Sequence, residues 1–411
     1  MDIRGDVRQC NELLKNEWLA AKEDFPDFLE EISTEKKQEN ESYTSRVSEC
    51  FHKQTEQLPR LPFGRSKWKK RTLNIIFQVL YQENIIGIHN AMQQKEITAF
   101  YEELMVFLKQ VRLFSPELKF DEIGQGIRNY IVYAMFKVIH HVQSGFSNAG
   151  FGYSMLYPFT DNYIDSMKPS SDEKKEYNRL IRDKLMGREV HPACEHHKKT
   201  CDLLQAIATD YPREKDDRIY TLLLLMLEAQ EESLRQQNQT IMLSEEERLD
   251  ISLFKGGVSV LVDRFLVNKE LTPADLHFYM GFGFYLQLAD DLQDIKEDSE
   301  KGHQTLFTVD LSTEREEKLV NKLLHFLNGI MNTYSAENDT FKNFVLESSN
   351  QLIYTSLCGS KEFFSREYQD RIEKYLPISL SYLEATKANS LDRQDDKIQD
   401  NYIKILDLLI K

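Results

Sequence analysis

The sequence has few residues that interrupt helices and few patterns that predict strands. It contains only 16 glycines and 10 prolines in 411 residues, and strict alternation of apolar and polar residues is scarce. Apolar residues instead recur every three or four positions over long stretches, as in 71–80, 101–113, 218–236 and 318–334. This spacing is that of one face of an α-helix, so the sequence predicts an all-α protein.

Other shortages exclude whole classes of protein. The five cysteines are odd in number and scattered, which is typical of free thiols and not of a disulfide framework. The longest apolar run, 222–227, is far shorter than the ~20 residues that span a bilayer. The first residues are charged, unlike a signal peptide. We therefore expect no integral membrane segment and a cytoplasmic location. The net charge of −15 disfavours nucleic acid as a partner.

One boundary stands out in this helical pattern. The segment QLPRLPFG (57–64) is rich in helix breakers. We expect residues 1–64 to form a charged, helical N-terminal extension and 65–385 to form one helical domain. Residues 386–411 should be a polar tail with a short amphipathic C-terminal helix. The basic run at 65–71 is interpreted as the solvated start of a helix.

The most informative stretch is GFGFYLQLADDLQDIKEDSEKG (281–302). On a helix, Asp290, Asp294 and Asp298 are spaced by four residues, and Gln287 and Asp291 each lie three residues from a member of that row, so one stripe carries several carboxylates. The run begins in buried-type apolar sequence, where repelling charges need a cation. Mg²⁺ commonly takes one or two carboxylates with water and phosphate oxygens. The alternative is a solvated acidic helix face.

A second acidic pair lies earlier, in SMLYPFTDNYIDS (154–166). Asp161 and Asp165 are four residues apart, so both can point to one side of a helix. The glycines of 144–154 predict a break between helices, with Pro158 in the first turn of the next helix. Two helices can then face each other across a bundle with carboxylates on both walls, a known way to build a metal site.

At these residues the chain resembles a known superfamily. QLADDLQDIKEDSEKG (287–302) resembles the second aspartate-rich motif of class I isoprenoid synthases, which include the trans-prenyltransferases and the squalene and phytoene synthases. Asp161 and Asp165 resemble the first motif of the squalene and phytoene synthase branch, and DNYID is also similar to the bacterial large terpene synthases. The resemblance implies a single antiparallel helical bundle with a central apolar pocket. It also implies three Mg²⁺ ions that bridge the carboxylates to a substrate diphosphate, and frequent dimers.

The resemblance gives roles to particular residues. It implies metal binding by both acidic motifs, with Asp161, Asp165, Asp290 and Asp294 as the catalytic carboxylates. Gln230 falls where prenyltransferases have a glutamine that faces the pocket. Gly256 and Gly257 would break a helix beside the pocket and place Lys255 near phosphate; close packing of two helices is the alternative. The metal ligands implied are Asp161, Asp165, Asp290, Asp291, Asp294 and Asp298.

Further candidates follow from their position beside the motifs. Lys296 and Lys301 can serve one diphosphate and its metals. Aromatic faces stabilise carbocations, which makes Tyr157 and Phe284 candidates for the pocket wall together with Gln287; for the aromatic residues, ordinary core packing is the alternative. The segment HPACEHHKKTC (191–201) has the residue types of a zinc site, but a single short cluster is more typical of a polar loop, and we expect no structural zinc.

The leading hypothesis is a class I terpene synthase that ionises an acyclic prenyl diphosphate to give a linear or cyclic terpene. A prenyl-coupling enzyme, either head-to-head or chain-elongating, is the first alternative. The first motif lacks adjacent aspartates and a following Arg-Arg pair, which disfavours elongation. A non-catalytic helical scaffold or subunit is the second alternative.

Overall fold

Helices account for all the regular structure in the described part of the chain. The computed structural model describes residues 2–59, 61–166, 168–238, 240–388 and 396–410, and no strand occurs among them. The prediction of an all-α protein is confirmed. The helices are α1 (Ile3–Ala20), α2 (Thr34–Glu56), α3 (Pro62–Gln82), α4 (Ile88–Ala91), α5 (Gln94–Phe114), α6 (Phe120–Ile139), α7 (Asn148–Asp165), α8 (Ser171–Leu185), α9 (Glu195–Asp210), α10 (Arg218–Ser233), η1 (Leu234–Gln237), α11 (Glu245–Asn268), α12 (Pro273–Gln293), α13 (Ile295–Lys301), α14 (Thr313–Thr333), α15 (Asp339–Gly359), η2 (Lys361–Phe363), α16 (Arg366–Glu373), α17 (Leu380–Ala388) and α18 (Asp396–Ile410).

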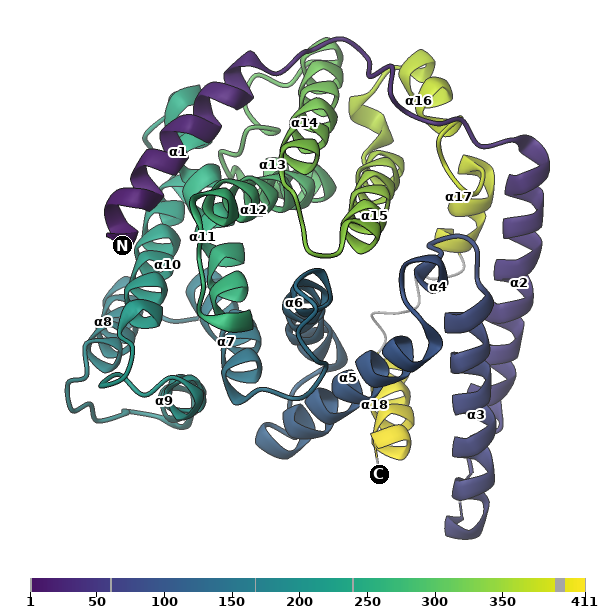
Figure 1. The fold of residues 1–411 in the computed structure, drawn as a ribbon, viewed down its shortest axis with the longest axis horizontal. Helices are drawn as coiled ribbons and strands as arrows, with labels where there is room; N and C mark the ends of the chain where they lie inside the picture. Colours follow the sequence, from purple (N-terminus) through teal and green to yellow (C-terminus); the bar gives the residue numbers. More distant parts are fainter. Residues whose placement is uncertain (1, 60, 167, 239, 389–395, 411) are drawn as a thin grey trace.

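The pair α11 and α12 forms the centre of the fold (Figure 1). Gly256 on α11 and Gly283 on α12 face each other so closely that a Cβ on either residue would collide with the backbone carbonyl of the other. A Cβ on Gly257 would lie 3.3 Å from Met280. The predicted break at Gly256 and Gly257 is wrong, because α11 runs unbroken through both residues. Gly256 and Gly257 instead allow α11 to pack closely against α12, which is the alternative that the sequence analysis left open.

The remaining helices of the core surround this pair. α6, α7 and α10 pack against α11, and α14 and α15 pack against α12. α1 belongs to the predicted N-terminal extension, yet it lies across both central helices (Figure 1) and buries Val7, Leu14 and Trp18 in the common core. In the described part of the chain, none of the helices has the length and apolar character needed to cross a bilayer.

Two local predictions need correction. No break occurs at the glycines, because Gly150 and Gly152 lie inside α7, whose N-cap is Ser147. Pro158 is therefore in the middle of this helix and not in its first turn. Pro158 has no N–H to donate, so one hydrogen bond of the α7 ladder is missing. Residues 191–201 were expected to form a polar loop, but α9 already begins at Glu195.

The edge of the fold opposite α8 and α9 is built from sequence-distant helices. α2 and α3 form an antiparallel hairpin whose joined end points away from the core (Figure 1). α18 packs on α3, α5 and α6, so the predicted amphipathic C-terminal helix is present. Residues 389–395 of the predicted polar tail lie outside the described residues.

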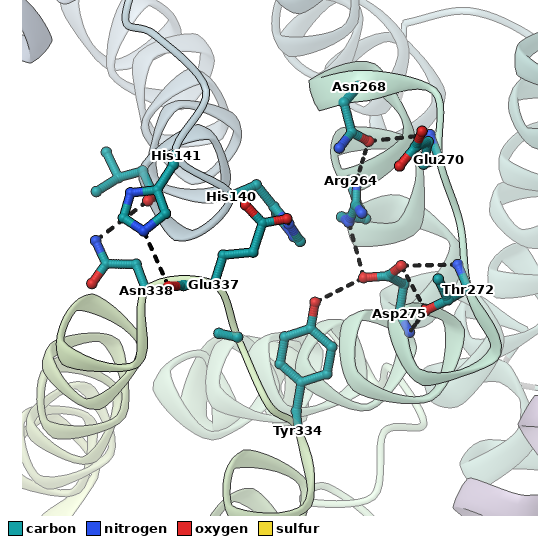
Figure 2. A network of polar contacts seen from close by, with 12 residues as sticks. His140, His141, Arg264, Asn268, Glu270, Thr272, Asp275, Tyr334, Glu337 and Asn338 are labelled. Atoms are coloured by element: carbon teal, nitrogen blue, oxygen red, sulfur yellow. Dashed lines mark hydrogen bonds and ion pairs between the residues drawn. The ribbon is translucent and has the colours of Figure 1, made fainter.

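A buried polar network ties the far ends of α11 and α12 to the chain after α14 (Figure 2). Asp275 accepts hydrogen bonds from Arg264 Nε (3.2 Å), the Tyr334 hydroxyl (2.7 Å) and the Thr272 backbone N–H (2.8 Å). Burial alone would raise the pKa of Asp275, but the hydrogen bond from Thr272 and the charge of Arg264 lower it. This carboxylate is a structural anchor whose partners are all present.

Candidate functional site

A pocket of about 260 Å³ lies beside the central pair, and residues from α6 through α12 line it. Its polar end carries Asp161, Gln230, Lys255 and Asp290. The residues of α11 that line the pocket run from Lys255 to Asp263. These two residues are eight positions apart, which corresponds to about 12 Å along the helix axis. The wall on the way is mostly apolar: Val132, Leu156, Ile181, Leu185, Leu204, Leu223, Met226, Leu227 and Val260.

Asp290 brings the second acidic motif to the polar end of the pocket, whereas Asp294 and Asp298 are absent from the pocket lining. α12 ends at Gln293 and α13 begins at Ile295, but backbone hydrogen bonds from Asp294 N to Asp290 O (2.9 Å) and from Asp298 N to Asp294 O (2.8 Å) preserve the four-residue spacing. Burial raises the pKa of Asp290 to about 6, and the neighbouring Asp294 adds to this. Burial and then Asp298 raise the pKa of Asp294. The three carboxylates therefore crowd together, as the sequence predicts.

Asp291 is buried and, like Asp294, is absent from the lining of the pocket. Its Oδ1 accepts a hydrogen bond from Gln287 Nε2 at 2.9 Å, while its Oδ2 has no hydrogen-bond partner among the described residues. Burial raises the pKa of Asp291 to about 8. An unpartnered buried carboxylate oxygen is costly, and a cation would relieve that cost.

The first acidic motif forms the opposite wall, because Asp161 lines the same pocket. Its Oδ1 accepts a hydrogen bond from Gln230 Nε2, so the predicted pocket glutamine and the predicted metal ligand are paired. Tyr157 lies one turn before Asp161 and also lines the pocket. Asp165 is the last residue of α7, and its side chain lies outside the described residues.

The predicted basic residues divide into two groups. Lys255 lines the pocket, and its charge lowers the pKa of Asp290 and of Asp291. Lys296 instead points to Glu362, at 3.5 Å. Lys301 pairs with Glu297, although its charge also lowers the pKa of Asp294.

Arg128 on α6 is a pocket residue that the sequence reasoning missed. It lines the polar end, and its charge lowers the pKa of Asp290. Gln125, Arg128, Asn129 and Val132 all line the pocket from α6. Polar residues at helical spacing in an otherwise apolar helix were the available signal.

The remaining predicted pocket residues are split between the pocket and the core. Gly256 and Gln287 line the pocket. Gly257 faces Met280, and Phe284 packs edge-on against Trp18 at 5.2 Å. Gly257 and Phe284 are absent from the pocket wall; for Phe284, ordinary core packing is the observed role.

Asp263 is the second pocket residue that the sequence reasoning missed. It is 5% exposed, and its Oδ1 has no hydrogen-bond partner among the described residues. Burial raises its pKa well above that of an ordinary aspartate, which favours the neutral carboxyl over the carboxylate. Nearby on the wall, the Tyr153 hydroxyl donates to the Ser259 carbonyl at 2.8 Å.

Two histidines of 191–201, His196 and His197, lie in an aromatic cluster away from the pocket. His196 stacks on Tyr163 at 4.8 Å and on Phe159 at 5.4 Å, and its Nε2 contacts the Phe159 carbonyl at 3.0 Å. Burial lowers the pKa of both His196 and His197. The absence of a structural zinc here stays a prediction.

Within the described residues, no three His, Cys, Asp or Glu side chains converge tightly enough to hold an ion by themselves. The donor set at the polar end nevertheless suits Mg²⁺, because Asp161 and Asp290 supply carboxylate oxygens there and Asp294 lies close to Asp290. Comparison of the chain with family models, with curated proteins and with solved structures finds no match.

Proposed function

We propose that this chain is a class I terpene synthase that ionises an acyclic prenyl diphosphate and converts the allylic carbocation to a linear or cyclic terpene. One observation carries the proposal: Asp161 and Asp290 come from separate helices to line one pocket, and most of the remaining wall of this pocket is apolar. A diphosphate with a hydrocarbon tail has the same division of polarity.

The protein residues divide the work along the pocket. Mg²⁺ bound at Asp161, Asp290, Asp294 and Asp298 would act as a Lewis acid towards the diphosphate oxygens. Lys255 and Arg128 would neutralise further charge on the leaving diphosphate. Gln230 holds Asp161 in place through its hydrogen bond.

The apolar depth protects the reactive hydrocarbon. Leucine and valine side chains exclude water that would quench a carbocation too early, and the ring of Tyr153 on this wall presents a face that stabilises positive charge. Because burial favours the protonated form of Asp263, its carboxyl is a weaker nucleophile than a carboxylate and is less able to trap the cation as an ester.

The test is incubation of the purified protein with allylic diphosphates of increasing chain length, with and without Mg²⁺ and isopentenyl diphosphate. We expect Mg²⁺-dependent release of diphosphate from the allylic substrate alone, and a product with the carbon count of the substrate. A product longer by one isoprene unit, or one that joins two chains, would identify a prenyl-coupling enzyme instead. No diphosphate release with any substrate would favour the scaffold.

A further inference from the structure

The joined end of the α2–α3 hairpin differs in charge from the rest of the molecule. Residues 52–71 contain seven lysines and arginines and one glutamate, in a chain whose net charge is −15. On α3, Arg65, Lys67 and Lys70 are exposed. Cations concentrated on one projection of an acidic protein produce a strongly asymmetric field.

The same end exposes apolar side chains. Phe63 is 86% exposed and Leu61 is 57% exposed, and Phe63 has the largest exposed fraction among the large apolar residues of the described chain. Pro62 between them is exposed as well. Phe63, Lys67 and Lys70 recur at four and three residues, so they share one face of α3. An apolar wedge therefore lies directly beside the cations.

Trp68 and Arg71 of α3 join the two helices of the hairpin. Trp68 is buried, and its Nε1 donates to the Gln54 carbonyl of α2 at 2.9 Å. Arg71 donates to the side chains of Gln54 (2.8 Å) and Gln57 (2.7 Å). The hairpin end also points away from the core (Figure 1). A flat surface could therefore reach Phe63 without meeting the acidic body of the protein.

We propose that this hairpin end, residues 57–59 and 61–71, docks the protein on an anionic lipid bilayer. The lysines would lie at the headgroups, where each basic residue contributes to attraction by acidic lipids, and Leu61, Pro62 and Phe63 would enter the acyl boundary. Leu61 and Pro62 would enter hydrocarbon without any cost of disrupting the bilayer's bonding, whereas insertion into a duplex must unstack bases at a cost of a few kcal/mol per step, so the bilayer is favoured over a polyanionic duplex. The docking is independent of the proposed function.

Sedimentation of the full-length protein with vesicles tests the proposal. We expect binding to vesicles of phosphatidylcholine with phosphatidylserine and much weaker binding to phosphatidylcholine alone, with loss of binding at high salt. Lys67→Gln with Lys70→Gln should reduce partitioning roughly thirtyfold, since each basic residue near the surface contributes a roughly fivefold factor. Phe63→Ser should reduce partitioning roughly tenfold.

Matched variants separate this surface from general effects. Lys22→Gln with Lys198→Gln removes the same charge from exposed sites elsewhere, and Met242→Ser removes a side chain that is 74% exposed; both should bind vesicles as the wild type does. In Phe63→Trp, tryptophan fluorescence should shift to shorter wavelength only with anionic vesicles. No vesicle binding by the wild type, or equal losses in the control variants, would overturn the proposal. Tighter binding to duplex DNA or RNA that is unchanged by Phe63→Ser would overturn it as well.

Discussion

Asp263 on α11 and Asp275 on α12 are both buried aspartates of the central helix pair, but they differ in how well their carboxyl oxygens are hydrogen bonded. Asp275 has Arg264, Tyr334 and Thr272 as partners, and its pKa is lowered. Asp263 faces the pocket with an unpartnered oxygen, and its pKa is raised. A buried carboxyl with satisfied partners stabilises a fold, whereas one left unsatisfied in a cavity is retained at a cost and points to a function.

The largest expected effect of this contrast is on stability. Asp275→Ala should lower the free energy of unfolding by about 3–5 kcal/mol, because it leaves the Arg264 charge buried without its partner. Urea denaturation measures the loss. Asp263→Ala provides the comparison and should cost much less, since no partner is stranded. Similar losses in both variants would remove the distinction between the two aspartates.

The second effect is on turnover and should spare stability. Asp161→Asn and Asp290→Asn should each reduce diphosphate release by about a hundredfold or more, because each removes a carboxylate ligand of the Mg²⁺ that would stabilise the leaving diphosphate. Their unfolding midpoints should stay equal to the wild type or rise, since Asp290 is held charged at a cost. The matched controls are Asp202→Asn and Glu300→Gln, both exposed. Wild-type rates in Asp161→Asn and Asp290→Asn would refute the site.

The third effect is a pH dependence that distinguishes Asp263. The folded protein holds the Asp263 proton more tightly than the unfolded chain, whose aspartate pKa is about 3.9, so stability falls as the pH rises from about 4 towards the raised pKa. In the wild type, this aspartate should lower the free energy of unfolding by up to about 1.4 kcal/mol per pH unit, and Asp263→Asn should remove that contribution. Unfolding free energies between pH 5 and pH 8 give both slopes. Identical slopes in variant and wild type would mean that Asp263 titrates normally.

The smallest effect separates a satisfied hydroxyl from an unsatisfied one. Tyr334→Phe should cost about 1–2 kcal/mol, because Asp275 loses a hydrogen bond of 2.7 Å. Tyr101 has a buried hydroxyl without a partner, so Tyr101→Phe should be neutral or stabilising. Thermal unfolding of the two variants side by side would show the difference, and an equal cost in both would contradict it.

Sequence reasoning was strongest where one residue type repeats at helical spacing. Asp290, Asp294 and Asp298 were predicted to cluster because their spacing alone places them together, and Asp161 was predicted to share their site. Arg128 and Asp263 are single residues in apolar helices, and only the arrangement of neighbouring helices brings them to the pocket. Phe284 lies on an apolar helix that is buried on all sides, so its spacing could not show that it faces Trp18 and not the pocket.

The glycine contact between α11 and α12 also determines which wall of the pocket can move. Because Gly256 and Gly283 are in backbone contact, neither helix can slide past the other without a collision. Lys255 and Asp290 should therefore keep fixed positions relative to each other. The facing wall of the pocket is α7, which lacks one backbone hydrogen bond because Pro158, three residues before Asp161, has no N–H. Any widening of the pocket to admit a bulky hydrocarbon should therefore occur by flexing α7 against a stationary α11–α12 frame.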